Sequence, residues 1–313
     1  MSADRQDLFR YVVEEFAEDY HEGEIDRREF VRRMGLLGGG AVGARALLTG
    51  LGIAGVTSAE VAQAMTAKPP VESTPPKPMV DPNDPTLKTE MLSWDARGFK
   101  QIAYLARPVD MLGAPGVLVI HENRGLQPHI QDIARRLAKA GFIALAPDLM
   151  SKGGGTAKFT DTAQISSSLA QTPGDEHIAN LLEGVKKLGE QKGVGKIGAV
   201  GFCFGGGLTW RLSTELPELV AAVPFYGPAP DLAKVPNIKA AVLAFYGGND
   251  SRINAGIPAL EAALKKAGTR YEIKIYEGAN HAFNNDTGAN YKKDAAEDAW
   301  KRTLAFLDAH LRS

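Results

Sequence analysis

The chain has 313 residues, with 36 Lys and Arg against 37 Asp and Glu, and a formal net charge of −1. This balance excludes an acidic solvating tail, and no basic patch points to a nucleic-acid partner. With 44% hydrophobic residues, the chain can bury one large core or two modest ones. A single cysteine, Cys203, excludes an intramolecular disulfide framework and gives no information about an oxidising compartment.

Residues 1–64 have the features of an export leader. An acidic segment with helical spacing of apolar residues precedes RREFV at positions 27–31, which resembles a twin-arginine export signal. A weakly apolar, glycine- and alanine-rich run at 34–56 follows, and AQA at 62–64 has the pattern of a cleavage site. The sequence therefore predicts the twin-arginine export machinery as a partner and a periplasmic or secreted location; without a functional leader the protein would be cytoplasmic.

A transmembrane anchor and an ordinary amphipathic helix are the alternatives for this segment. Five glycines between Gly35 and Gly43, together with Arg45 inside the apolar run, disfavour a stable membrane-spanning helix. The long acidic stretch before the arginines and the charge of Arg45 both depart from a simple export signal. Residues 65–87 are rich in proline and lack an apolar period, which predicts a semi-rigid linker or N-terminal arm. One folded domain is expected at 88–313.

From residue 88 onward, apolar strands alternate with helical segments. Strands are expected at 88–94, 99–107, 116–120, 142–146, 196–200, 221–226, 240–246 and 271–276, the first two as an antiparallel pair. Helices are expected at 130–140, 176–190, 257–267 and 289–311, and residues 151–174 predict a loop with a short helix. This alternation predicts an α/β protein whose mostly parallel sheet, of about eight strands, is covered by helices on both faces.

The lone cysteine lies in a glycine-rich turn between a strand and a helix. Residues 201–206 read GFCFGG, which has the form G-x-nucleophile-x-G with cysteine where hydrolases usually carry serine. Small residues at 201 and 205 are expected because a nucleophile at a strained turn leaves no room for side chains beside it. A buried structural cysteine in a glycine-rich turn is the alternative interpretation.

Two further reactive side chains follow later strands, at the edge where the carboxyl ends of parallel strands meet. Asp250 follows the strand at 240–246 and His281 follows the strand at 271–276, so Cys203, Asp250 and His281 occur in the order of an α/β-hydrolase triad. A thiol is mostly protonated at neutral pH, so His281 would take its proton and Asp250 would orient the imidazole. Asp250 as a turn residue or helix cap, and His281 as a surface histidine, are the alternatives.

The oxyanion that forms on attack needs hydrogen-bond donors. The backbone N–H of Phe204, at the head of a helix, and that of Asn123, in the loop after the strand at 116–120, are expected to supply them. Glu122 lies beside this loop and is expected to be functional rather than a solvated loop carboxylate. Arg124 is a candidate for binding a substrate anion, for pairing with Glu122 or for bracing the loop.

The remaining candidates are expected to be structural. His121, His129 and His177 have no partner pattern, and Asp148 after Pro147 predicts a turn residue. The histidines are scattered, without an H-x-x-x-H pattern or paired cysteines, so no metal site is expected. No Walker-type loop indicates a bound nucleotide, and no cofactor is expected.

Together these motifs resemble the dienelactone hydrolase family of α/β-hydrolases over about residues 88–312. The resemblance rests on GFCFGG at 201–206, the strand followed by HE at 121–122, APDL at 146–149, YGGND at 246–250 and GANHAF at 278–283. It implies a triad of Cys203, His281 and Asp250, and a Glu122 that interacts with the resting thiol and helps switch it to thiolate when substrate arrives. The implied reaction is hydrolysis of an enol-lactone or similarly activated ester through a thioester.

The sequence departs from the family at the substrate. Members that act on dienelactone hold its carboxylate with arginines, one of them shortly after the catalytic histidine, whereas NND at 284–286 follows Phe283 here. Residues 151–174 contain no arginine, which leaves Arg124 and Arg252 as candidates. The leading prediction is therefore an exported hydrolase of esters or lactones. An acyltransferase or peptidase with the same triad is the second prediction, and a non-catalytic, thiol-sensing binding protein is the third.

Overall fold

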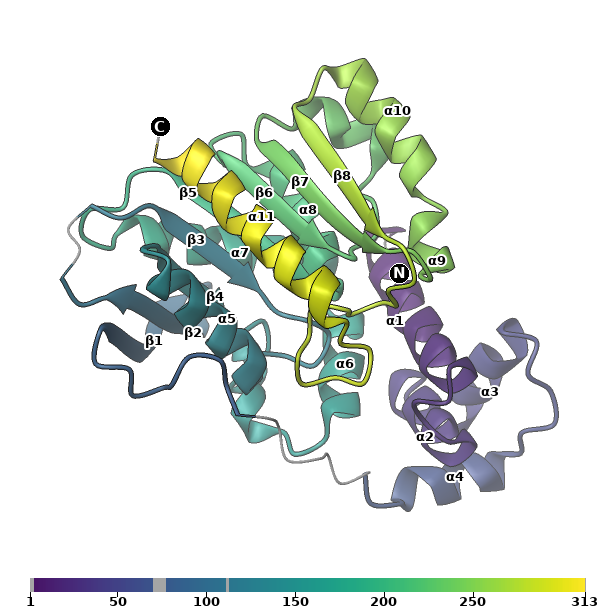
Figure 1. Cartoon of the computed structure of the whole chain (residues 1–313). Helices are drawn as coiled ribbons and strands as arrows, with labels where there is room; N and C mark the ends of the chain where they lie inside the picture. Colours follow the sequence, from purple (N-terminus) through teal and green to yellow (C-terminus); the bar gives the residue numbers. More distant parts are fainter. Residues whose placement is uncertain (1–2, 70–76, 111–112, 313) are drawn as a thin grey trace.

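The computed structural model describes residues 3–69, 77–110 and 113–312, and its centre is an eight-stranded sheet (Figure 1). The strand order is β1-β2-β4-β3-β5-β6-β7-β8. β2 runs antiparallel to both β1 and β4, and β3 to β8 run parallel to one another. The strands are β1 Leu87–Ala96, β2 Phe99–Pro108, β3 Gly116–Ile120, β4 Ile143–Pro147, β5 Ile197–Phe202, β6 Ala221–Phe225, β7 Ala241–Gly247 and β8 Tyr271–Tyr276.

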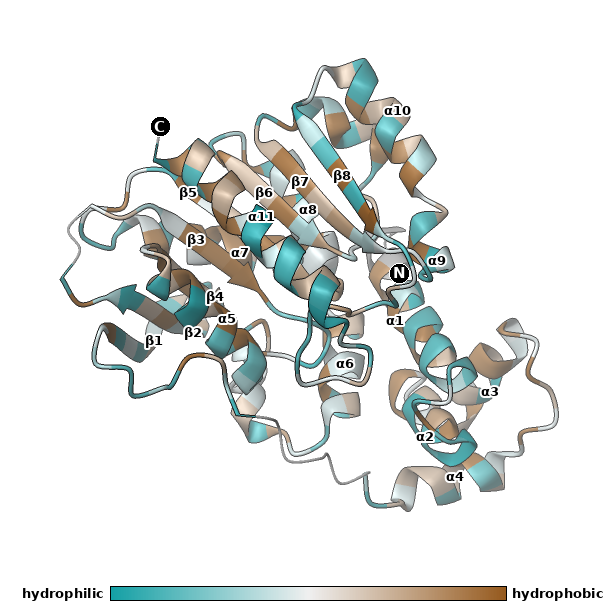
Figure 2. Ribbon diagram, in the orientation of Figure 1, coloured by the Kyte–Doolittle hydropathy of each residue, from teal (hydrophilic) through white to brown (hydrophobic). Residues whose placement is uncertain are grey.

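Helices cover both faces of this sheet, which confirms the predicted α/β architecture. α5 (Pro128–Lys139) and α11 (Lys293–Leu311) lie on one face, and α7 (Gly174–Gly189) and α8 (Phe204–Glu215) lie on the other (Figure 1). α10 (Ile257–Ala267) flanks the β8 side of the sheet. Every residue of the central strands β3, β4, β6 and β7 is buried, which explains their continuous apolar sequences (Figure 2).

The segment at 151–174 contains more helix than the sequence predicts. It forms two short turns, Ser151–Gly153 and Thr156–Lys158, and then α6 (Thr162–Gln171). Asp148 organises its start, because the carboxylate accepts hydrogen bonds from the backbone N–H groups of Met150 (2.9 Å) and Thr156 (2.6 Å). Asp148 is thus a turn residue, and α6 lies near the edge of the sheet where the strands end.

Residues 3–66 form four helices: α1 Ala3–His21, α2 Arg27–Leu37, α3 Ala41–Gly50 and α4 Ser58–Thr66. α2, α3 and α4 form a lobe beside the sheet domain, and α1 extends from this lobe toward α9 (Ser251–Asn254) at the end of the sheet (Figure 1). Both α1 and α2 pack on α6. The segment whose sequence resembles an export leader is therefore folded against the sheet domain.

Caps and glycines explain why this lobe folds. Asp26 caps α2 by accepting the N–H of Glu29 (2.7 Å), and Thr57 forms a capping box at the start of α4. The glycine run between α2 and α3 brings two backbones into contact: a Cβ on Gly43 would lie 2.0 Å from the carbonyl oxygen of Gly38. Over the ranges that the structure describes, no helix combines the length and apolarity that crossing a membrane requires.

The four arginines of α2 divide into two pairs. Arg27 and Arg28, of the export-like motif, are exposed at the first turn of the helix. Arg32 is buried and lies 2.6 Å from both Glu29 and Asp161, which links α2 to the N-terminus of α6. Removing one partner of a buried ion pair leaves an uncompensated charge, so this contact fixes the lobe on the domain.

The chain between α4 and β1 is partly attached to the domain. Residues 70–76 of the predicted linker lie outside the described residues. Beyond them, the N–H groups of Met79 and Val80 donate to the carboxylate of Asp132 on α5 (3.2 and 2.9 Å). Arg135 Nε donates to the carbonyl oxygen of Val80 (2.9 Å), so this part of the chain is docked on α5.

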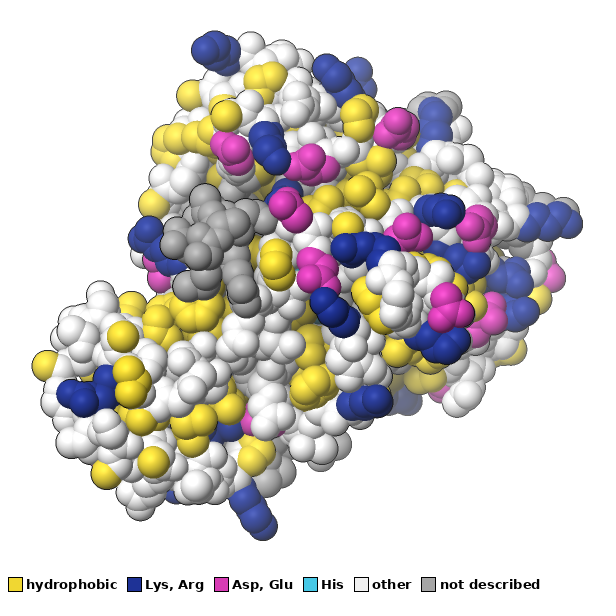
Figure 3. All heavy atoms as spheres, turned by 180° about the vertical axis from the view of Figure 1, so that it is seen from behind, with side chains coloured by type: hydrophobic (Ala, Val, Ile, Leu, Met, Phe, Trp, Pro, Cys, Tyr) yellow, Lys and Arg dark blue, Asp and Glu magenta, His cyan; other side chains and the backbone are white. Residues whose placement is uncertain are grey.

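The surface carries charges of both signs. Seen from behind, Lys and Arg side chains lie among Asp and Glu side chains without a field of one sign (Figure 3). The large exposed hydrophobic side chains in the described part of the chain lie on different segments: Val42, Met79, Met91, Val109, Leu232 and Ile275. The mixed charges on this face agree with the nearly balanced composition.

One buried histidine links α6, α7 and α8. The Nε2 atom of His177, on α7, lies 2.9 Å from the carbonyl oxygen of Leu169 on α6, and its ring packs edge-on against Phe204. Because a carbonyl only accepts, Nε2 carries the proton. Burial lowers the pKa of His177 to about 4, so the folded protein keeps this imidazole neutral.

This lowered pKa predicts a loss of stability in mild acid. The imidazole of His177 takes up a proton near pH 6.5 in the unfolded chain but only near pH 4 in the folded chain. The stability that the neutral imidazole contributes to the fold is therefore fully present above pH 6.5 and is lost as the pH falls to about 4. We expect His177 to account for roughly 3 kcal/mol of the decline in unfolding free energy over this window. Urea denaturation of wild type and His177→Gln at both pH values measures it; equal declines would contradict the assignment.

Candidate active site

Cys203 lies at a sharp turn between β5 and α8. Its backbone has φ 54° and ψ −119°, in a region that residues with a side chain rarely adopt. The thiol is buried, with 3% of the residue exposed, and Phe204 is the first residue of α8. The structure thus has the strand–turn–helix arrangement that the sequence predicts around Cys203.

The glycines of this turn are required by close backbone contacts. A Cβ on Gly205 would lie 2.3 Å from the carbonyl oxygen of Ile120, at the end of β3. A Cβ on Gly201 would lie 2.2 Å from the carbonyl oxygen of Gly205. Both distances are far below van der Waals contact, so neither position has room for a side chain, as the sequence predicts.

Asp250 and His281 lie together beyond the ends of β7 and β8. The imidazole Nδ1 of His281 lies 2.6 Å from Oδ2 of Asp250, and Oδ1 of Asp250 accepts the N–H of Ile253 (3.1 Å). Asp250 therefore caps α9 and holds the imidazole at the same time, which unites two interpretations that the sequence left open. His281 is buried, which excludes a surface position for it.

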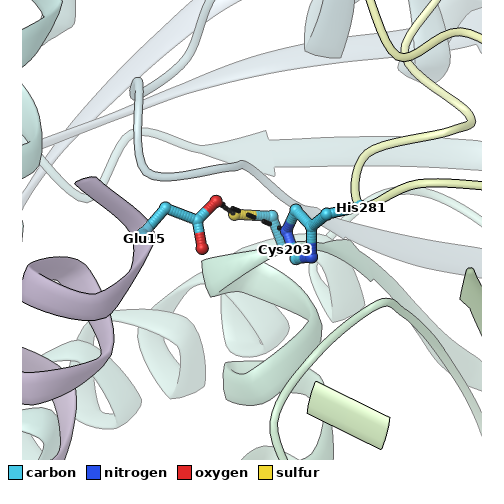
Figure 4. A group of neighbouring side chains, drawn as sticks. All are labelled: Glu15, Cys203 and His281. Atoms are coloured by element: carbon cyan, nitrogen blue, oxygen red, sulfur yellow. Dashed lines mark hydrogen bonds and ion pairs between the residues drawn. The ribbon is translucent and has the colours of Figure 1, made fainter. Parts of the chain in front are cut away.

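Helix α1 reaches this site and places two side chains against the thiol. Tyr11 Oη lies 3.2 Å from Cys203 Sγ, and the thiol donates to Glu15 Oε1 over 3.6 Å. The same carboxylate oxygen lies 3.4 Å from Nε2 of His281 (Figure 4). Tyr11 and Glu15 are four residues apart, so they share one face of the helix. The Glu15 carboxylate thus contacts both the thiol and the imidazole.

These neighbouring groups favour one protonation state. Burial disfavours the imidazolium of His281, but the charge of Glu15 and the hydrogen bond with Asp250 raise its pKa well above the ordinary value. Burial raises the pKa of the Cys203 thiol, and the charge of Glu15 raises it further. Burial opposes ionisation of Glu15, but the charges of His281 and Arg252 lower its pKa. These directions favour a protonated thiol, an imidazolium and a carboxylate in the resting site.

The loop after β3 brings Glu122 and Asn123 to the same place. Oε2 of Glu122 accepts a hydrogen bond from Asn285 Nδ2 (2.8 Å), while Oε1 is buried without a hydrogen-bond partner in the described chain. The carbonyl oxygen of Asn123 accepts the hydroxyl of Ser166 (2.8 Å), which fixes the loop on α6. The thiol contacts Tyr11 and Glu15 of α1, whereas the resemblance implied a contact with Glu122.

Two other histidines are held by structural contacts. Nε2 of His121 accepts the N–H of Leu149 (3.1 Å), so its Nδ1 carries the proton and donates to the carbonyl oxygen of Glu122 (2.6 Å). These bonds join the loop after β3 to the segment after β4. His129 Nδ1 lies 2.9 Å from Asp286.

A cleft of about 350 Å³ opens at the thiol, and α1 forms one of its walls. The α1 side chains that line it are mostly acidic, namely Glu15, Glu18 and Asp19, and Glu22 lines it just after the helix ends. Arg124 lines the same cleft and is exposed. Arg252 instead donates to Glu15 (2.6 Å) and Glu18 (2.8 Å), and its guanidinium lies over the ring of Tyr11. One arginine candidate therefore lines the cleft, and the other is bound to α1.

The cluster also has the composition of a metal-ligand set. A carboxylate oxygen of Glu15, Sγ of Cys203 and a ring nitrogen of His281 all lie within 4.8 Å of one another. Oxygen, sulfur and nitrogen donors suit Zn²⁺. The sequence did not reveal this set, because Glu15 lies 188 residues before Cys203. The only sequence feature around Glu15 was the helical spacing of apolar residues near the N-terminus. This spacing predicts a helix but not where that helix packs.

Comparisons with known proteins agree with this geometry. The Dienelactone hydrolase family matches residues 102–311. A relative from Saccharolobus solfataricus, "Putative carboxymethylenebutenolidase", is 36% identical over 249 residues, which cover 68% of this chain and 96% of the relative. A protein of the same description from Escherichia coli K12 is 32% identical over 243 residues, which cover 73% of this chain and 90% of that protein.

A solved structure gives the same result for the fold. The "Putative Dienelactone Hydrolase" from Klebsiella pneumoniae has a TM-score of 0.67 and 31% identity, covering 72% of this chain and 99% of its own. The predicted α/β-hydrolase fold is thereby confirmed. Helices α1 to α4 precede the family match, which begins at residue 102.

The close contact at Gly205 gives a testable prediction. Gly205→Ala places a methyl group where the carbonyl oxygens of Ile120 and His121 lie, so the turn must shift, at a cost of roughly 1–3 kcal/mol. Gly195→Ala is the matched control, because nothing lies within 4 Å of its Cβ position. Urea denaturation should separate the two variants; equal stabilities would show that the turn tolerates a side chain.

Proposed function

We propose that this chain, which belongs to the dienelactone hydrolase family and is an ester or lactone hydrolase, attacks its substrate with the thiol of Cys203. His281 serves as base and then as acid, and Asp250 orients the imidazole. The observation that carries the proposal is the 2.6 Å contact between His281 and Asp250 beside a cysteine held in a left-handed turn.

The reaction has two halves. In the first, Sγ of Cys203 bonds to the carbonyl carbon while the thiol proton passes to Nε2 of His281. The carbon–oxygen bond to the alkoxide then breaks, and the alkoxide takes that proton. In the second, His281 takes a proton from water, the water oxygen bonds to the thioester carbon, and the carbon–sulfur bond breaks. The sulfur recovers the proton from His281, and one water is consumed for each ester or lactone opened.

Backbone amides are proposed to stabilise the oxyanion of each half. Phe204 is the first residue of α8, and the N–H groups of a first helical turn have no acceptor inside the helix. The loop that carries Asn123 touches this turn, because a Cβ on Gly205 would lie 2.4 Å from the carbonyl oxygen of His121. The N–H groups of Phe204 and Asn123 are therefore the proposed donors.

Glu122 is proposed to favour the thiolate only indirectly. Burial and the charge of Glu15 raise the pKa of Cys203 most, and the negative charge of Glu122 raises it further. Glu122 therefore opposes ionisation of the resting thiol. A thiol proton shared with Oε1 of Glu122, which is buried and unpartnered in the described chain, would remove that opposition. This role requires a rearrangement in which the thiol leaves Glu15 for Glu122.

The proposed substrates are small esters or lactones. The descriptions of the relatives name a carboxymethylenebutenolidase, which is the basis for including lactones. The arginine that would follow the catalytic histidine is absent, since Asn284, Asn285 and Asp286 occupy these positions. Asp286 is itself paired with Arg136 (2.7 Å), so it provides no site for a substrate carboxylate. Arg124, which lines the cleft, is the proposed contact for an anionic group.

Replacement of the nucleophile tests this mechanism. Cys203→Ala should reduce hydrolysis of p-nitrophenyl acetate by roughly 10³-fold or more, because the covalent step is lost. Acid quenching of wild type during turnover, followed by mass spectrometry, should detect one acetyl group on Cys203, because the thioester is an intermediate. Undiminished turnover by Cys203→Ala with an unchanged melting temperature would refute the scheme. Acetyl transfer to an added alcohol or amine, in place of acetate release, would identify a transferase.

We also propose that the leader directs export through the twin-arginine machinery. Arg27 and Arg28 are exposed at the start of α2, where a receptor can reach them. The pattern AQA at 62–64 lies near the end of α4, the last helix of the lobe, and the docked segment begins at Met79. Cleavage there would release all of α1 to α3 and most of α4.

Fractionation of a host that carries this machinery tests export. We expect wild type in the periplasm or medium with a mature N-terminus near residue 65, and Arg27→Lys/Arg28→Lys retained in the cytoplasm at full length. Arg45→Lys, in the same leader but outside the motif, is the control and should be exported. Full-length wild type confined to the cytoplasm would contradict the proposal.

A further inference from the structure

The position of α1 leaves no room for the attack. A reacting carbonyl carbon must come within about 3–3.5 Å of the nucleophile. The hydroxyl of Tyr11 lies 3.2 Å from Sγ, and the carboxylate of Glu15 lies 3.6 Å from it. The same carboxylate lies 3.4 Å from Nε2 of His281, on the nitrogen that would accept the thiol proton. Both reacting atoms are therefore in contact with α1 (Figure 4).

The charge of Glu15 also opposes the first proton transfer. An imidazolium has no lone pair on Nε2, so it cannot take a proton from a thiol. The carboxylate of Glu15 lies 3.4 Å from Nε2, where its charge stabilises the imidazolium. Steric contact and charge thus act in the same direction.

Several contacts hold α1 in this position. Val12 and Phe16 are buried side chains of the same helix. Arg252, two residues after Asp250, donates to both Glu15 and Glu18. Arg33 of α2 pairs with Asp19 near the end of α1 (2.7 Å). The face of the domain around Cys203 is therefore a binding surface for an amphipathic helix with acidic residues at this spacing.

We propose that α1 is an inhibitory segment that occupies the active site, and that the hydrolase becomes active when α1 leaves it. The proposal rests on the proposed function of Cys203 and His281, and it adds a state in which α1 keeps substrate from reaching them. Cleavage at 62–64 would remove the covalent link between α1 and the domain, so loss of the leader would allow the site to open.

Alkylation of Cys203 by iodoacetamide tests the proposal on the full chain. Cys203 is the only cysteine, so the label reports this thiol alone. Tyr11→Phe/Glu15→Gln removes the hydroxyl that contacts the thiol and the charge that pairs with Arg252 and His281, while keeping the size of each side chain. Glu14→Gln is the matched control, because Glu14 pairs with Arg10 on the exposed side of α1. We expect alkylation of the double variant to be about tenfold faster and that of the control to be unchanged.

A pH profile separates opening of the site from a change in thiol acidity. The titratable and charged groups around the thiol and imidazole are Tyr11, Glu15, Glu122, Tyr226, Asp250 and Arg252. Loss of the Glu15 charge lowers the pKa of Cys203, which shifts the profile to lower pH but leaves the maximal rate at high pH unchanged. Opening of the site raises that maximal rate. A shifted profile with an unchanged maximum would overturn the proposal.

Cleavage of the folded chain gives a second measurement that does not depend on substitutions. A protease site inserted between residues 69 and 77 allows the leader to be cut after folding. We expect both the alkylation rate and p-nitrophenyl acetate turnover to rise, and a synthetic peptide of residues 3–21 to lower them again. A wild-type thiol that reacts as fast before the cut as after it would refute the inhibition.

The two readouts distinguish the two proposals. Faster alkylation without ester turnover in any form of the protein would support inhibition by α1 and refute the proposed hydrolysis. Turnover that depends on Cys203 but is equal before and after the cut would support hydrolysis and refute inhibition.

Discussion

The contact between Gly205 and the end of β3 is the constraint on which the active site depends. A Cβ at 205 would clash with the carbonyl oxygens of Ile120 and His121, at 2.3 and 2.4 Å, so the backbone would have to shift. Because residue 205 is a glycine, the first turn of α8 can lie directly on the loop that carries Glu122 and Asn123. Cys203, two residues earlier, has a positive φ of 54° in the same turn. The absence of a side chain at 205 therefore lets the turn that carries Cys203 lie against the loop after β3.

The site is also constrained by the number of charges buried in it. Glu15, Asp250 and His281 are buried and Arg252 is partly buried, and each is compensated by another member of the group. An unpaired charge in such a place costs several kcal/mol, so the group is stable only as a whole. Departure of α1 would take Glu15 away from Arg252 and from Nε2 of His281, while Asp250 would stay on Nδ1. Water or an anionic group must then replace Glu15, and His281 regains a pKa that allows it to act as a base.

The sequence predicted the parts of the site that local rules determine. Cys203, Asp250 and His281 follow strands of a parallel sheet, and such strands end at one edge, so their meeting followed from the order of elements. Glycines at 201 and 205 followed from the demands of the turn. Tyr11 and Glu15 were missed because the docking of α1 depends on the shape of a distant surface, and helical spacing carries no information about that surface. The Arg32–Asp161 pair was missed for the same reason: 129 residues separate its partners.

The N-terminal segment carries two sets of features on separate residues, and this separation is what makes both proposals compatible. The export-like motif uses Arg27 and Arg28, which are exposed while α2 is folded, whereas docking uses Arg32 and Arg33, which are paired with Asp161 and Asp19. A receptor can therefore bind the motif without first displacing α1 from the thiol. Since α1 precedes the cleavage pattern at 62–64, the proposed cut would separate both the motif and α1 from the sheet domain. A hydrolase built in this way would keep its thiol covered for as long as the leader remains attached.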